Sequence, residues 1–204
     1  MGWTETTATF FKPNGSVDLK RECDELMTAR WACGPGEICD TVVVASSLVG
    51  KVWYGAVRNR AYASRADLDA GLPAEDRTEG WVVLVEARGR LWRYKEIHEC
   101  CGPVHRDCPR KVLDALTPTQ DALSLAWREE CAEAAEERSW RRTALGKARS
   151  VEWRATFDSE IFSEGEAVEL RKARSGKRAV WAIPGTGSYI PAKYLAPGNC
   201  TVLA

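Results

Sequence analysis

The stretch TVVVASSLVGKVWYGAVRNR, residues 41–60, is rich in β-branched and aromatic side chains, a composition typical of β-strands. Gly50 interrupts the stretch and predicts a turn between two strands. A second stretch, EGWVVLVEARGRLWRYKEI at residues 79–97, has the same character, and Arg88-Gly89 can form the turn of a hairpin. Together they decide the fold of the first part of the chain, because they predict three or four antiparallel strands.

The segments around these strands have other signals. RADLDAGLPAEDRTEG, residues 65–80, is polar and contains Gly and Pro, so it predicts an exposed loop with a helical turn. TPTQ at residues 117–120 matches a capping box with Pro at the first helical position. Gly146 offers a stop, so a long helix is expected from about Pro118 to Leu145. Its apolar face at i, i+4 spacing consists of Leu123, Trp127, Cys131 and Ala135.

After residue 150 the sequence changes to short apolar runs separated by turn residues, and Ser175-Gly176 predicts a hairpin. A Val-x-Leu strand after a Gly, a Trp-containing return strand, a Gly-rich loop and Ile-Pro-x-x-Tyr-Leu follow in order. This pattern resembles a small SH3-like barrel. The expected fold class is therefore α+β: an antiparallel sheet packed against a long helix in residues 1–147, followed by a small SH3-like β domain in residues 151–204.

The composition excludes binding to a polyanion that is driven by the net charge of the chain. Lys+Arg and Asp+Glu number 29 each, so no net field draws the chain to nucleic acid or to a membrane. The N-terminal residues lack an export signal, and no segment approaches the length of a membrane span. A cytoplasmic protein that does not contact a membrane is expected, with its eight cysteines reduced.

The cluster HECCGPVHRDCP, residues 98–109, holds both histidines of the chain. As a metal site it offers ligand types that zinc prefers, but no C-x2-C pair recurs at a second position, which weakens that hypothesis. The candidate ligands are His98, Cys101, His105 and Cys108.

As a catalytic site, the same cluster offers a nucleophile. A helix beginning at Pro109 would place Cys108 at its N-cap, where a thiolate is stabilised. His105 or His98 could act as base, with Glu99, Glu96 or Asp107 orienting it. The favoured interpretation is a plain turn, in which Gly102-Pro103 leads the chain out of the sheet and the cysteines pack as small apolar groups. Cys33 and Cys39, on either side of the turn GPGE, receive the same interpretation.

Five blocks of sequence resemble an uncharacterised domain family found in phage, plasmid and bacterial genomes, over about residues 1–131. They are YGAVR, WVVLVEAR, YKEIHECCGP, DCPRKVLDALTPT and AWREEC. The family brings no known activity, and this chain departs from it in having Cys100-Cys101 where an apolar residue precedes Gly-Pro. The positions matching the family pattern are Lys95, Glu99, Gly102, Pro103, Cys108, Pro109, Trp127, Arg128 and Cys131.

Among these positions, Lys95, Glu99 and Arg128 are the polar residues of interest. They are expected either to form a buried ion-pair network that fixes the helix on the sheet, which is the favoured alternative, or to line a binding pocket.

One basic patch suggests contact with nucleic acid. LRKARSGKR crowds cations at a hairpin tip that can follow phosphates, while Trp181 on the return strand stacks on a base. Acidic neighbours Glu166 and Glu169 dilute this patch. Its cations are Arg171, Lys172, Arg174, Lys177 and Arg178.

No nucleotide-binding, metalloprotease or hydrolase motif is present, and no cofactor is expected. The sequence therefore favours a non-catalytic interaction protein of a phage or mobile element that binds a host macromolecule. A protein is the favoured class of partner, and counteraction of host defence is one role that such binding would serve. The alternatives are nucleic-acid binding through residues 171–178 and a cysteine enzyme or zinc protein centred on Cys108. The oligomeric state is not predicted.

Overall fold

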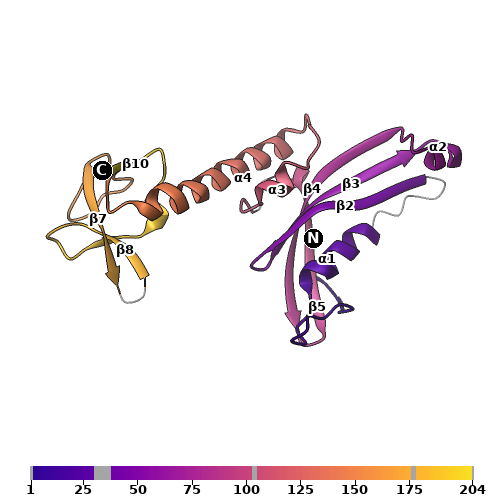
Figure 1. The fold of residues 1–204 in the computed structure, drawn as a ribbon, viewed down its shortest axis with the longest axis horizontal. Helices are drawn as coiled ribbons and strands as arrows, with labels where there is room; N and C mark the ends of the chain where they lie inside the picture. The colour runs from indigo at the N-terminus through magenta and orange to yellow at the C-terminus, as the bar shows by residue number, and fades with distance from the viewer. Residues whose placement is uncertain (1, 30–37, 103–104, 176–177, 204) are drawn as a thin grey trace. The chain divides into compact units, whose positions relative to one another are not determined.

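The computed structural model describes residues 2–29, 38–102, 105–175 and 178–203. It shows an α+β fold with two five-stranded sheets whose neighbouring strands pair antiparallel. The chain divides into two compact units, Met1–Ala135 and Glu136–Ala204. Figure 1 shows the helices and strands of each unit.

The sheet of the first unit has the strand order β1-β5-β4-β3-β2. The predicted turns at Gly50 and Gly89 are confirmed, and both glycines have positive φ. The helical turn α2 (Arg65–Ala70) is also confirmed, but residues 75–80 continue the next strand instead of forming a loop. The strands are β1 (Thr4–Thr7), β2 (Ile38–Val49), β3 (Val52–Tyr62), β4 (Glu75–Arg88) and β5 (Leu91–His98).

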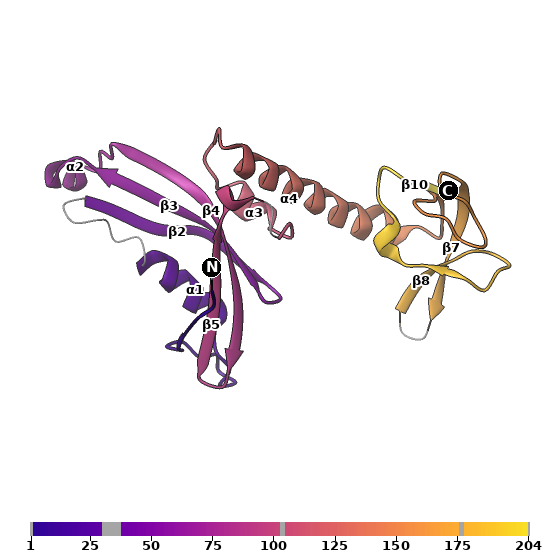
Figure 2. The ribbon, with the colours of Figure 1, turned by 180° about the vertical axis from the view of Figure 1, so that it is seen from behind.

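Both faces of this sheet are covered, which explains why its central strands are apolar without alternation. Trp53 and Val83 face a cluster that includes Cys23 and Met27 of helix α1 (Leu19–Ala29). Their neighbours, Tyr54 and Val82, face a second cluster that includes Val112 of α3 (Arg110–Leu113). Figures 1 and 2 show α1 and α3 on opposite sides of the sheet.

Helix α4 (Ala122–Trp140) begins later than the capping-box pattern predicts. Thr117 does not cap it, because its hydroxyl and amide bond to Thr78 on β4. Asp121 takes that role, accepting hydrogen bonds of 2.8 Å from both the amide and the hydroxyl of Ser124. In the first unit, only the early part of α4 enters the core, through Trp127 and Cys131.

The second unit has the sheet order β10-β6-β7-β8-β9. Trp153 is fully buried in its core, and its indole N–H donates to the carbonyl of Tyr194. The elements are η2 (Arg141–Leu145, a π-helical segment), β6 (Ser150–Arg154), β7 (Ala167–Ser175), β8 (Arg178–Ala182), β9 (Tyr189–Ile190), η3 (Ala192–Tyr194) and β10 (Cys200–Leu203).

The division between the units falls at residues 135–136, earlier than the expected boundary at 147–151. Leu145 is buried in the core of the second unit. The Arg141 guanidinium donates to the carbonyls of Lys193 and Leu195. These contacts tie the end of the helical region to the second unit.

Cysteine pairing departs in part from the expectation of reduced thiols. Cys39 is disulfide-bonded, which corrects the expectation for that residue, and Cys33 lies outside the described residues. The described cysteines that are not disulfide-bonded are Cys23, Cys100, Cys101, Cys108, Cys131 and Cys200. None of the helices in the described ranges combines the length and the apolar composition that a membrane-spanning helix needs.

Candidate functional site

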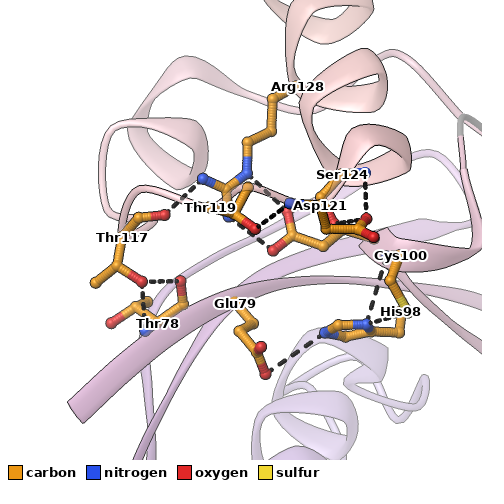
Figure 3. Close-up of polar contacts among 10 residues, drawn as sticks. Thr78, Glu79, His98, Cys100, Thr117, Thr119, Asp121, Ser124 and Arg128 are labelled. Carbon is orange, nitrogen blue, oxygen red and sulfur yellow. Dashed lines mark hydrogen bonds and ion pairs between the residues drawn. The ribbon is translucent and has the colours of Figure 1, made fainter.

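A buried ion pair joins η1 (Glu99–Cys101), which follows β5, to helix α4 (Figure 3). The Arg128 guanidinium donates to both carboxylate oxygens of Glu99, at 2.8 and 2.7 Å, and to the carbonyl of Thr117 at 2.6 Å. Glu99 is 3% exposed, so both its oxygens depend on this bidentate contact. Lys95 lies on β5 opposite Leu84 of β4, and it takes no part in the Glu99–Arg128 pair.

Gly80 allows this pair to approach the sheet. A Cβ atom there would lie 2.8 Å from the Trp127 ring and 2.9 Å from a Glu99 carboxylate oxygen. Such distances are well inside van der Waals contact, so a side chain at this position would push both buried groups away. The Glu99–Arg128 pair is therefore a structural clamp between sheet and helix.

A second polar group lies beside the clamp and links three side chains in series (Figure 3). His98 Nδ1 is 2.8 Å from the sulfur of Cys100, and His98 Nε2 is 3.5 Å from Glu79 Oε2. The imidazole packs at 4.6 Å, between ring centroids, from Trp81, its partner across the β4–β5 ladder. A carboxylate, an imidazole and an exposed thiol thus stand in the order found in general-base sites.

The ionisation of the two outer groups follows from these contacts. The contact with His98 lowers the pKa of the Glu79 carboxyl, so this group is anionic at neutral pH. Desolvation and the neighbouring Cys101 thiol raise the pKa of Cys100. The Cys100 thiol is therefore protonated at neutral pH and needs a base to become a nucleophile.

Cys108 does not have the environment of a catalytic nucleophile. It is fully buried among Tyr54, Val112 and other apolar side chains. The N-cap of the four-residue helix α3 is Pro109, so the predicted N-cap position for Cys108 is wrong. His105 contributes its backbone carbonyl, which accepts a hydrogen bond of 3.0 Å from the Trp127 indole.

The predicted zinc ligands are not gathered into a metal site. In the part of the chain that the structure describes, no three His, Cys, Asp or Glu side chains form a group that could hold a metal ion. His98 contacts Cys100 and Glu79, Cys101 is exposed, and Cys108 is in the core. Glu99, a candidate for orienting a base, is instead bound to Arg128.

The basic patch of the second unit differs from the predicted one in the residues that it contains. Trp181 is 3% exposed and belongs to the core, so its predicted stacking on a base is wrong. The side chains of Lys177 and Arg178 lie outside the described set. Exposed Arg171 pairs with Glu169 at 2.9 Å, while Lys172 and Arg174 line a hollow of about 500 Å³ together with Arg149.

A groove of about 520 Å³ lies along strand β2 in the first unit. Val42 and Val44 on this strand are 40% and 45% exposed. Strand β2 is the last in its sheet order, and among the described residues no strand pairs with its outer edge. The groove is lined by Lys20, Asp24, Glu25 and Thr28 of α1, residues 42–46 of β2, and Lys111 of α3.

Sequence reasoning missed Cys100, Glu79 and Arg149 as candidate site residues. A signal for the first two was present in the hairpin register: the turn at Gly89 pairs Arg88 with Leu91 and, counting outward, Trp81 with His98. Glu79 then lies two residues beyond Trp81, on the same face of the strand. Arg149 had no comparable signal, because its hollow is formed only when β7 folds beside residue 149.

The chain matches no protein-family model, no curated protein and no solved structure.

Proposed function

We propose that this chain is a non-catalytic interaction protein of a phage or mobile element that acts in the cytoplasm by binding a host protein. Host defence is the pathway in which we would seek that protein first. The sequence blocks that resemble the phage and plasmid family support the biological setting. The observation that carries the proposal is the open edge of strand β2.

Exposed strand edges are normally protected by charge, proline or cover, because their free backbone groups can pair with another chain. The nine residues TVVVASSLV, 41–49, carry no charged side chain and no proline. Val42 and Val44 add exposed apolar surface at the same edge. An uncharged edge with apolar side chains fits the addition of a strand from a binding partner.

The shape of the edge limits which segment can add to it. A β-bulge between Val43 and Ala45 bends the strand, which disfavours indiscriminate edge-to-edge pairing. The groove beside it is bounded by Asp24 and Glu25 of α1 and by Lys111 of α3. We therefore assign the groove to an extended segment of a host protein, with apolar side chains against the valines and charged side chains toward the two helices.

The first test is capture of binding partners from host lysate with the tagged full-length chain, with and without nuclease. The proposal expects a single stoichiometric protein that remains after nuclease treatment. Capture of nucleic acid alone, or of proteins that are lost with nuclease, contradicts it.

A variant of the edge tests the assigned position. Val44→Lys places on β2 a charge that is solvated in the free protein but buried by an added strand, so capture should fall by about 10-fold or more. Val202→Lys is the matched control, since Val202 is 40% exposed on β10 of the second unit. Equal capture by Val44→Lys and by the unmodified chain would place the partner elsewhere.

For the second unit we propose an SH3-like barrel. The support is its strand order, in which the last strand β10 pairs with the first strand β6 and the others follow in sequence. The short helix η3 lies within the Ile-Pro-x-x-Tyr-Leu segment and precedes the last strand. The resemblance concerns fold only.

A second candidate function, nucleic-acid binding, is supported by the basic hollow at Arg149, Lys172 and Arg174. Lys172 also donates to the carbonyl of Gly146 at 2.6 Å, which holds its ammonium at the rim. Because the buried Trp181 offers no stacking face, recognition would rest on phosphates alone. This function predicts an affinity that falls steeply with salt and drops in the Lys172→Ala/Arg174→Ala variant; an affinity independent of salt contradicts it.

A further inference from the structure

We infer that Cys100 is a reactive thiol, which exchanges with the disulfide of a small-molecule thiol and takes up that molecule as a mixed disulfide. The inference rests on the serial contacts of Glu79, His98 and Cys100, and it goes beyond the proposed binding function. It also assigns the reactivity predicted for the buried Cys108 to Cys100, which is exposed to reagents.

The imidazole is held in a productive orientation. Glu79 lies at the Nε2 side of the His98 ring and Cys100 at the Nδ1 side, while Trp81 packs against the ring. Because the anionic carboxylate favours a proton on Nε2, Nδ1 is left as the acceptor for the thiol proton. His98 Nδ1 also accepts a long hydrogen bond of 3.4 Å from the backbone N–H of Cys100 at the start of η1.

The exchange follows from this geometry and balances without an external oxidant. As the Cys100 sulfur attacks one sulfur of the reagent, its proton moves to His98 Nδ1 and the S–S bond of the reagent breaks. The imidazolium formed faces the Glu79 carboxylate, which stabilises it. The departing thiolate takes the proton back, so the products are the Cys100 mixed disulfide, one free small thiol and neutral His98.

The neighbouring cysteine is a built-in control. Cys101 is also exposed and free, but its sulfur has no imidazole contact in the described structure. If exposure alone governed reactivity, the two thiols would react alike. Base assistance at Cys100 alone predicts that they differ.

The experiment treats the full chain with glutathione disulfide and follows the rate constant at each cysteine by peptide mass spectrometry. We expect the mixed disulfide to form first at Cys100, to persist in Cys101→Ser and to be lost in Cys100→Ser. His98→Gln should lower the rate constant at Cys100 by about 10-fold or more. Equal or faster modification of Cys101 in the unmodified chain overturns the inference, and that comparison needs no variant to fold.

A pH profile separates base assistance from a merely structural effect. The charged or titratable groups facing this thiol are Glu79 on β4, His98 on β5, Cys101 on η1 and Asp121 before α4. In the unmodified chain the Cys100 rate should remain measurable below the pH range in which a free thiol ionises. In His98→Gln it should rise with pH as for an unassisted thiol, and an unchanged profile in that variant overturns the inference.

Discussion

Arg128 and Glu99 form the contact on which the first unit depends at the scale of single residues. Glu99 is almost fully enclosed, and its carboxylate is compensated by the guanidinium. Removing one partner of a buried pair leaves an uncompensated charge, which costs more than the pair contributes.

We therefore predict that Arg128→Ala lowers the free energy of unfolding by about 3–5 kcal/mol, measured by urea denaturation. Arg171→Ala is the matched control, since Arg171 pairs with Glu169 at the surface, and its cost should stay below about 1 kcal/mol. Similar costs for the two variants would contradict the role of the buried clamp.

A pH dependence belongs to the same scale. The pKa of Glu79 is lowered by His98, so the folded state binds a proton there less readily than the unfolded state. The stability from this contact is present above the ordinary pKa of a glutamate and is lost as pH falls through the lowered folded pKa. Urea midpoints measured downward from about pH 5 should fall less steeply in Glu79→Gln than in the unmodified chain. Identical slopes would show that the contact does not form in solution.

At the scale of elements, the start of helix α4 shows how two plausible caps compete. TPTQ has the capping-box pattern, but Thr117 bonds to Thr78 across a long sequence separation. The helix consequently begins beyond it, and Asp121 bonds to Ser124. Local pattern alone does not show that a candidate cap is already used by the sheet.

Substituting the cap tests this assignment. Asp121→Ala should cost about 1 kcal/mol of unfolding free energy, because the amide of Ser124 loses its acceptor. Gln120→Ala, which removes the exposed glutamine of the capping-box pattern, should change stability by less than about 0.5 kcal/mol. A larger loss in Gln120→Ala than in Asp121→Ala would restore the original prediction.

The strands were largely predictable because their signals are local. Gly50 and Gly89 mark turns, and the apolar runs beside them are rich in β-branched residues, which favours strands. Helix α1 was not predicted, although Leu19, Cys23 and Met27 have helical spacing. The candidate site was harder to predict from the sequence than the strands. Glu99 and Arg128 were identified together, whereas the proposed reactivity of Cys100 depends on the register of the β4–β5 ladder and on the burial of Cys108.

At the scale of the whole molecule, the chain contains two compact units with separate cores. The expected division after the long helix did not account for Arg141 and Leu145, whose contacts are made with strands and loops that follow much later. Such contacts have no local signature. The same limit applies to binding, since an open sheet edge is recognised only when the strand order is known.

Hydrogen–deuterium exchange of the captured complex, compared with the free chain, tests the central claim most directly. If a host segment adds to the sheet, the amides of β2 at residues 38–49 gain more protection than any other segment, because the added strand supplies their missing partners. Unchanged exchange in β2, with protection gained around Arg149, Lys172 and Arg174, would contradict the account and assign binding to the basic hollow of the second unit.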